Sequence, residues 1–260
     1  MTAVALLPPQ QLTGYVWPLA EARVSLPFGP SPWGEMVVNG QLFHDGLDIT
    51  TACGDQVLAA HDGVVLAAGR EYDDYVGWVG DLAPYYDWLN RHGYWNSLPI
   101  VVVIDDGDGY RSIYAHEAWV SVVPGQAVRA GDMIGSEGMT GNATGCHVHF
   151  GLFSPFETRT FALDPDIVER DSLPPLEIAR IDPLLVLPFR CDVEEQVALR
   201  PAEASACPPP TKRPVVPTKK PAAPTPSAKS TPSISAAPAT AAPASAAPAT
   251  APATAPPSSP

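Results

Sequence analysis

Short runs of β-branched and aromatic residues, separated by glycine and other turn-forming residues, dominate the first two thirds of the chain. Strands are expected over 64–67, 100–104, 111–114, 120–123 and 148–153, because each run is rich in Val, Ile, Tyr or Phe and is bounded by turn signals. Few stretches show the 3.6-residue periodicity of an amphipathic helix. The pattern therefore predicts a mainly β fold built from antiparallel strands.

One segment, 71–99, interrupts this rhythm. It holds eight of the 21 aromatic residues of the chain (6 Trp, 8 Tyr and 7 Phe). Within it, 81–91 is expected to be a helix, with Asp81 as its N-cap and Gly93 just past its end. We interpret the segment as a short, aromatic-rich helical insertion packed over the sheet. Packing is the preferred role of its rings, and the wall of a substrate groove is the alternative.

Composition divides the chain into four parts. Residues 208–260 are almost entirely Ala, Pro, Thr and Ser, which cannot bury enough apolar surface to offset the entropy of an ordered backbone. We therefore expect a disordered tail over 208–260, preceded by a leader segment over 1–14, one domain over 15–190 and a short extension over 191–207. The tail carries five basic residues and no acidic one: Lys212, Arg213, Lys219, Lys220 and Lys229.

The charge of the chain excludes several classes of protein. The 260 residues carry 15 basic and 28 acidic side chains, a net charge of -13, with a pI near 4.7. An acidic chain of this kind is not expected to bind nucleic acid or anionic lipid. No apolar run approaches the roughly 20 residues that would span a bilayer. The run 3–7 is too short for the core of a signal peptide, so none is predicted.

The four cysteines leave several possibilities open. Cys53, Cys146, Cys191 and Cys207 allow two disulfides in three connectivities, which would suit an oxidising compartment. Four free, buried thiols are the alternative. No C-x-x-C pair is present, which argues against a closed zinc site built on sulfur.

Histidines carry the chemistry that the sequence indicates. In GCHVHF (145–150), the two histidines are one residue apart, so on a strand both His147 and His149 face one side, with Cys146 on the other. In HDGLD (44–48), the spacing also places His44 and Asp48 on a common side. Two histidines, one aspartate and a water form the usual composition of an open catalytic zinc site.

Other polar residues are interpreted as structural. His61 and His92 belong to neither motif and are expected to be surface or loop histidines. Asp45 is expected on the opposite side of an extended backbone from the ligands, where it would cap the turn. Asp105 and Asp106 lie in DDGDG, which is typical of a hairpin turn rather than of a paired-carboxylate site.

Taken together, these motifs resemble those of the lysostaphin-type zinc metallopeptidases. The motifs are HDGLD (44–48), YAH (114–116) and TGCHVHF (144–150), and the similarity extends to WP (17–18), PFG (27–29), DGVV (62–65), the glycine spacing over 125–145 and IDP (181–183). It covers roughly residues 15–190. The resemblance implies a two-layer antiparallel β fold, the duplicated hybrid motif, with a groove over the central sheet.

The resemblance also implies a role for each site residue. His44, Asp48 and His149 would bind Zn²⁺, and His116 and His147 would stand beside the metal as catalytic residues. The implied activity is hydrolysis of peptide bonds in peptidoglycan cross-links or stem peptides by a metal-activated water. The motifs do not say which of His116 and His147 is the general base.

Two other functional classes were weighed. One is a catalytically silent envelope protein of the same fold that binds peptidoglycan or activates an amidase. The other is a phosphocarrier domain, which Asp48 and the additional histidines disfavour. From the substrate, we expect a secreted or envelope-associated monomer whose partner is peptidoglycan peptides.

Overall fold

The computed structural model describes residues 7–78, 80–154, 162–163, 168–169 and 180–208. The chain divides into two units, 1–211 and 212–260, and the elements described here belong to the first. The expected disordered tail lies outside the described residues, apart from Pro208, and so do the first six residues of the expected leader segment.

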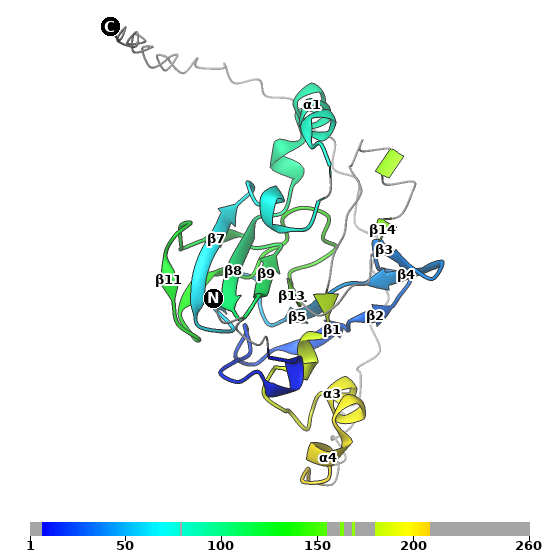
Figure 1. Cartoon of the computed structure of the whole chain (residues 1–260), viewed down its shortest axis with the longest axis vertical. Helices are drawn as coiled ribbons and strands as arrows, with labels where there is room; N and C mark the ends of the chain where they lie inside the picture. The colour runs from blue at the N-terminus through cyan, green and yellow to red at the C-terminus, as the bar shows by residue number, and fades with distance from the viewer. Residues whose placement is uncertain (1–6, 79, 155–161, 164–167, 170–179, 209–260) are drawn as a thin grey trace, which may run out of the picture. The chain divides into compact units, whose positions relative to one another are not determined.

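An antiparallel sheet forms the centre of the first unit (Figure 1). Every strand pair in it is antiparallel, and β15 lies off the main path of strands and pairs with β13. In spatial order its strands are β1 (Arg23–Leu26), β5 (Leu47–Thr50), β13 (Val148–Phe153), β9 (Tyr110–Ala115), β8 (Val101–Gly107), β7 (Gly63–Gly69) and β11 (Ala127–Val128), with β15 (Arg180–Ile181) beside β13.

Two smaller antiparallel sheets accompany the central one. The first has the order β10 (Trp119–Val120), β12 (Met133–Ser136) and β6 (Gln56–Leu58). The second has the order β14 (Ala162–Leu163), β3 (Met36–Val38), β4 (Gln41–His44) and β2 (Gly29–Pro30). The prediction of a mainly β, antiparallel fold is confirmed.

The core lies on both faces of the central sheet. Along β8, Val102 and Ile104 belong to one apolar cluster, while Val101 and Val103 belong to another. This division follows from the two-residue period of a strand, and it explains why this strand is apolar without alternation. The first cluster includes Val57 of β6 and Ile134 of β12, and the second includes Met36 and Phe43 of the sheet that holds β3 and β4.

Most of the expected strands are confirmed. Those over 64–67, 111–114 and 148–153 lie within β7, β9 and β13, and 100–104 corresponds to the start of β8. The prediction of a strand over 120–123 is wrong, because β10 ends at Val120. The chain instead turns over 123–126, where the Gln126 N–H donates to the Val123 carbonyl at 3.1 Å and Pro124 occupies the position that proline favours in a β-turn. Val123 is accordingly 64% exposed.

The hairpin turn expected in DDGDG (105–109) is present at the end of that motif. It consists of Asp108 and Gly109, with φ of 51° and 82°, while Asp105 and Asp106 still belong to β8. Two positive φ values are required by the tight hairpin turn that matches strand twist. Asp106 is instead buried, and it accepts hydrogen bonds from the hydroxyls of Tyr15 and Ser112.

The aromatic segment contains the expected helix, but the helix starts two residues later than predicted. Helix α1 spans Ala83–His92, and Gly93 ends it in the left-handed region with φ of 69°. Leu82 occupies the N-cap position, although the Asp81 carboxylate does accept a hydrogen bond from the Ala83 N–H. Before the helix, Tyr72, Tyr75 and Trp78 pack against the second apolar cluster of the central sheet, as predicted.

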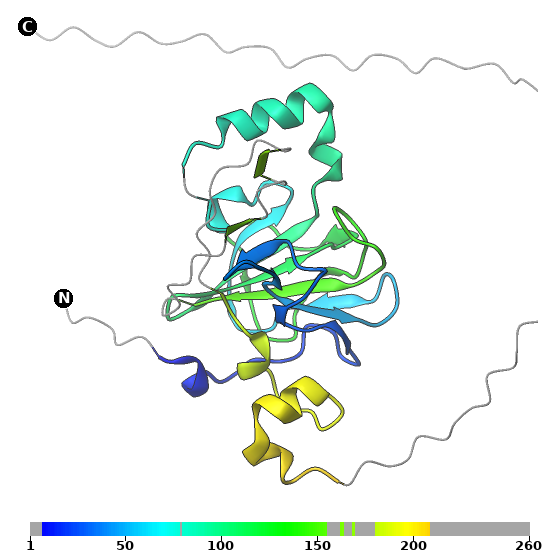
Figure 2. The same ribbon diagram turned by 90° about the vertical axis from the view of Figure 1, so that its right-hand side faces the viewer.

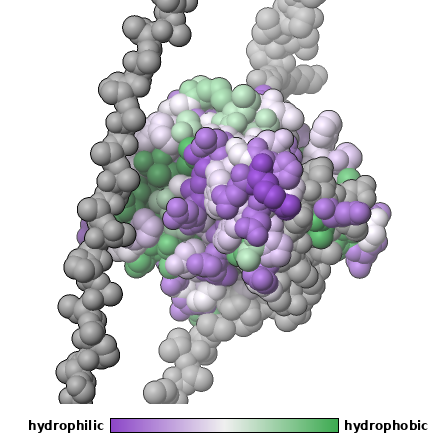
Figure 3. Space-filling model, turned by 90° about the horizontal axis from the view of Figure 1, so that it is seen from above, coloured by the Kyte–Doolittle hydropathy of each residue, from purple (hydrophilic) through white to green (hydrophobic). Residues whose placement is uncertain are grey.

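Helix α1 and the C-terminal helices lie at opposite ends of the unit (Figures 1 and 2). Seen from the α1 end, the surface is hydrophilic at its centre, and hydrophobic areas lie toward its margins (Figure 3). At the other end are α3 (Glu194–Leu199) and α4 (Pro201–Ala204). The buried side chain of Gln196 donates hydrogen bonds to the carbonyls of Leu184, Leu187 and Pro188, which fixes this extension to the β domain.

The structure selects one of the three cysteine connectivities. Cys53 is bonded to Cys146, and Cys191 is bonded to Cys207, so that no cysteine is free. The second disulfide closes the extension on itself. Among the described residues, none of the helices has the length and apolarity needed to cross a membrane.

Asp106 provides a test of this core through the pH dependence of stability. Burial raises its pKa from 3.8 to about 7, despite the hydrogen bonds from Ser112 and Tyr15. The pKa of Asp106 is higher in the folded state than in the unfolded state. The stability that the protonated Asp106 contributes is therefore complete below about pH 4, and it is lost as the pH rises toward 7. Asn at this position does not titrate. In denaturant unfolding experiments, we expect the free energy of unfolding of the native chain to fall, relative to Asp106→Asn, by on the order of 4 kcal/mol across this window. Parallel pH profiles for the two proteins would contradict the assignment.

Candidate metal centre

Strand register places two site residues opposite each other in the central sheet, and a third directly follows the neighbouring strand. Asp48 of β5 lies directly opposite His149 of β13, and His149 lies opposite Ala115 of β9. Side chains of directly paired residues share a face of the sheet and lie within reach of one another. His116 follows Ala115, so all three strands bring a candidate residue to the same region.

His44 reaches the same region from another sheet. It is the last residue of β4, where it pairs with Gly29 of β2. Only Asp45 and Gly46 separate β4 from β5, so the chain passes from one sheet to the other within two residues. Gly46 is required at this crossing, because a Cβ there would lie 2.5 Å from Nε2 of His149.

The three expected ligands meet at one point. His44 Nε2 lies 3.0 Å from Asp48 Oδ1 and 3.0 Å from His149 Nδ1, and His149 Nδ1 lies 3.1 Å from Asp48 Oδ1. Zinc–nitrogen distances of about 2.0–2.1 Å place neighbouring donors of a tetrahedral site about 3.3 Å apart. The triangle therefore has nearly the size that such an ion requires.

The hydrogen bonds of His44 show that its lone pair faces the triangle. Its Nδ1 lies 3.0 Å from the carbonyl oxygen of Pro27, which can only accept, so Nδ1 carries the hydrogen and Nε2 is left as a donor to a metal. A carboxylate oxygen and a second imidazole nitrogen face the same point. Three converging electron pairs at this separation suit a bound cation, and the residues present fit zinc.

The electrostatics of the triangle agree with this interpretation. Burial alone would raise the pKa of Asp48, but its hydrogen bonds with His149 and His44 hold the pKa well below its usual range. Burial acts to lower the pKa of His44, yet the contact with Asp48 outweighs it and the pKa is raised. Asp48 is therefore the negative charge around which the site is organised.

His116 and His147 lie beside the triangle. Their ring centroids are 4.6 Å apart, and Nε2 of His147 lies 3.7 Å from the second oxygen of Asp48. Each ring donates from Nδ1 to a backbone carbonyl, His116 to Thr140 at 2.7 Å and His147 to Gly145 at 2.9 Å. Both rings consequently carry their free lone pair on Nε2. Burial, reinforced by the nearby His149, lowers the pKa of His116 to about 4.

The backbone of His116 is itself unusual, and no sequence signal predicts it. Its φ is 70°, in the left-handed region that residues other than glycine rarely adopt. Backbone strain of this kind costs on the order of 1–3 kcal/mol and persists only where the surroundings fix it. The bond to Thr140 supplies part of that restraint, and the Thr140 hydroxyl adds to it by accepting from the Ile100 N–H and donating to the Glu117 carbonyl.

The structure gives Asp45 a different environment from the expected turn cap. It is buried and forms an ion pair with Arg180 at 2.6 Å, and its other oxygen lies 3.8 Å from Nε2 of His149. The guanidinium of Arg180 lies over the ring of Phe153 and 3.3 Å from the same His149 nitrogen. Arg180 was missed from the sequence, although it directly precedes the IDP motif (181–183), because no local pattern shows that β15 pairs with β13.

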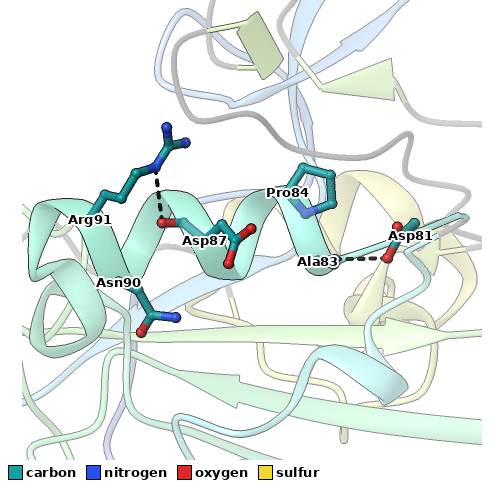
Figure 4. A pocket seen from close by; sticks show the side chains of 6 residues that line it. All are labelled: Asp81, Ala83, Pro84, Asp87, Asn90 and Arg91. Atoms are coloured by element: carbon teal, nitrogen blue, oxygen red, sulfur yellow. Dashed lines mark hydrogen bonds between the residues drawn. The ribbon is translucent and has the colours of Figure 1, made fainter.

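The remaining histidines lie outside the site. His61 contacts the carbonyl oxygens of Thr13 and Asp62. His92 contacts the carbonyl oxygen of Trp88, and its ring packs against the Trp88 ring in a tilted arrangement. A separate depression of about 560 Å³ runs along α1 (Figure 4), and none of the five candidate residues lines it. Its lining consists of Asp81, Ala83, Pro84, Asp87, Asn90 and Arg91.

Comparison with known proteins supports the motif assignment. Residues 42–161 match the family model described as peptidase family M23. DD-carboxypeptidase/endopeptidase Mpg of Neisseria meningitidis is 31% identical over 133 residues, which are 51% of this chain and 25% of Mpg. The glycyl-glycine endopeptidase ALE-1 of Staphylococcus capitis is 31% identical over 139 residues, which are 53% of this chain and 31% of ALE-1. The match therefore spans about a quarter to a third of these relatives.

Among solved structures, the catalytic domain of lysostaphin from Staphylococcus simulans is similar. The alignment covers 62% of this chain and 89% of that domain, with 25% sequence identity and a TM-score of 0.39.

Gly46 allows the geometry of the centre to be tested without removing a ligand. In Gly46→Ala, the added methyl group would displace His149, so we expect zinc affinity to fall about 10- to 100-fold, the range typical of disturbed ligand orientation. Competition with a chromogenic chelator measures this. Gly145→Ala is the matched control, since a Cβ there meets open space, and it should bind zinc as the native chain does. Equal affinities for the two variants would refute the crowding at His149.

Proposed function

We propose that this chain, which carries a peptidase M23 domain over residues 42–161, is a zinc-dependent endopeptidase that hydrolyses peptide bonds in peptidoglycan cross-links or stem peptides. The observation that carries the proposal is the triangle of His44, Asp48 and His149, whose donor atoms lie 3.0–3.1 Å apart. Three protein ligands leave a coordination position open, as catalytic zinc sites do and closed structural sites do not.

In this proposal, His44 Nε2, His149 Nδ1 and Asp48 Oδ1 hold the metal. A bound zinc ion would lower the pKa of its water ligand and would polarise the carbonyl of the scissile peptide bond. The protein contributes the fixed geometry of the three donors. The Asp45 carboxylate lies behind His149, on the side where a metal-bound imidazole usually donates its other N–H to an acceptor, and Arg180 holds that carboxylate in place.

His116 and His147 perform the proton transfers. Each offers Nε2 toward the site because its Nδ1 hydrogen is held by a carbonyl. A neutral imidazole accepts a proton from the attacking water and returns one to the leaving amine. The second imidazole, once protonated, donates a hydrogen bond to the oxyanion of the tetrahedral intermediate, and loss of such a donor costs about 10²–10³ in rate.

The substrate class rests on the family. The two relatives named above are called a DD-carboxypeptidase/endopeptidase and a glycyl-glycine endopeptidase, and the motifs resemble those of enzymes that cut peptidoglycan. Because these names imply different bonds, we propose the class of substrate and leave the bond to experiment. A secreted or envelope-associated location follows from such a substrate. A screen of peptidoglycans with different bridges, read by mass spectrometry of the fragments, would identify the bond.

Metal dependence is the first test of the proposal. The purified chain should hold about one zinc ion, and removal by a chelator should abolish release of new amino groups from peptidoglycan, since in this proposal the metal activates the water. Addition of zinc should restore the activity. A holo-protein that releases no amines from any peptidoglycan would instead support a catalytically silent binding protein.

Separating binding from catalysis is the second test. His147→Ala should lower kcat by about 10²-fold or more and leave zinc affinity nearly unchanged, because His147 is not one of the three donors. Asp48→Ala should lose both zinc and activity. Hydrolysis that persists at the native rate in His147→Ala would show that this residue has no catalytic role.

A further inference from the structure

Glu137 is fully buried close to the candidate site, and the proposed chemistry does not use it. It directly follows β12, and its exposure is 0%. A buried carboxylate is costly unless hydrogen bonds compensate for the water it loses. Its surroundings therefore indicate what the carboxylate contributes.

Among the described residues, the hydrogen-bond donors to the Glu137 carboxylate come from one place, the end of β5 and the residue after it. The Thr50 hydroxyl donates to Oε1 at 2.8 Å, the Thr51 hydroxyl donates to Oε2 at 2.6 Å, and the Thr51 N–H lies 3.1–3.2 Å from both oxygens. Thr50 is two residues from Asp48 on the same strand. The carboxylate consequently ties the end of β12 to the strand that carries the aspartate of the triangle.

The same segments hold His147. The residue after Glu137, Gly138, accepts a hydrogen bond from the His147 N–H at 3.1 Å. The carbonyl of Cys146 lies 3.0 Å from the Thr50 hydroxyl, and the Cys146 side chain is bonded to Cys53, three residues after Thr50. Glu137 thus lies at the junction of the two segments that fix His147.

A buried carboxylate in this fold does not always join two segments through hydrogen bonds. Glu117 is also fully buried, yet within the described part of the chain neither of its carboxylate oxygens has a hydrogen-bond partner. Glu137 differs in having three donors, all from the segment that follows a proposed metal ligand.

We propose that Glu137 is a positioning residue for His147. By holding the end of β5 against the turn at Gly138, it sets the place from which Nε2 of His147 faces Asp48. The expected effect of Glu137 on the rate depends on the proposed function. The expected effect of Glu137 on the His147 ring depends on the geometry alone.

The experiment compares Glu137→Ala and Glu137→Gln with the native chain, each as the full zinc-loaded protein. Misplacement of a reacting group by about 1 Å typically costs about 100-fold. We expect kcat on peptidoglycan to fall about that much in Glu137→Ala, with KM and zinc affinity within about 2-fold of native. Glu137→Gln keeps one acceptor oxygen and should recover part of the rate.

Long-range ¹H–¹⁵N spectra of the histidine rings provide a readout that does not depend on activity. The His147 signals are identified by their absence from His147→Ala. In the native chain they should show the hydrogen on Nδ1, as the contact with Gly145 requires. In Glu137→Ala they should show a mixture of the two tautomers, whereas the signals of His44 and His149 should stay in place.

Asp106→Asn is the matched control, because Asp106 is another buried carboxylate held by hydroxyl donors but lies away from this junction. It should leave kcat and the His147 signals unchanged. If Glu137→Ala does not fold, Thr51→Val replaces it and Thr51→Ser serves as the rescue.

Two results would overturn the proposal. One is a folded Glu137→Ala with native kcat and native His147 signals. The other is a loss of zinc in proportion to the loss of rate, which would assign Glu137 to the metal centre instead. Should the native chain hydrolyse no peptidoglycan, the proposed function fails, and the His147 spectra still decide whether Glu137 positions the ring.

Discussion

The candidate site depends on the register between β5 and β13. Asp48 and His149 are directly opposed in that pairing, and their neighbours Leu47, Ile49, Val148 and Phe150 are buried in the apolar cluster on the other face. A slip of one residue would turn the polar pair into the core and the apolar residues toward the site. The hydrophobic effect that fixes the strands thus also fixes the distance between two proposed ligands.

Several parts of this arrangement could be predicted from the sequence. The alternation in GCHVHF places His149 on one face, and the apolar runs identify β7, β8, β9 and β13. What could not be predicted is contact between segments with no local signal. The partner of His116 is the carbonyl of Thr140, and every residue has a carbonyl. Arg180 reaches Asp45 only because β15 pairs with β13. The hairpin turn in DDGDG was predicted, but the sequence offers two Asp–Gly pairs and does not say which of them forms the turn.

Buried polar groups concentrate where rigid placement is needed. Asp45 with Arg180, Glu137 with the two threonines, and Thr140 with its backbone partners all surround the candidate residues. Such groups contribute little net stability compared with an apolar core of the same volume. Their main effect is on side-chain orientation, since a hydrogen bond fixes an orientation that packing alone does not. The strained backbone of His116 is held among them.

The disulfide between Cys53 and Cys146 has a practical consequence for anyone producing this protein. It covalently links the residue just before His147 to the turn after β5, across 93 positions of sequence. A preparation made and kept under reducing conditions would contain every proposed ligand and both proposed catalytic histidines, yet would lack this link. Weak activity in such a sample would describe the thiol form of the protein, and the oxidation state has to be established before kinetic constants from different hosts are compared.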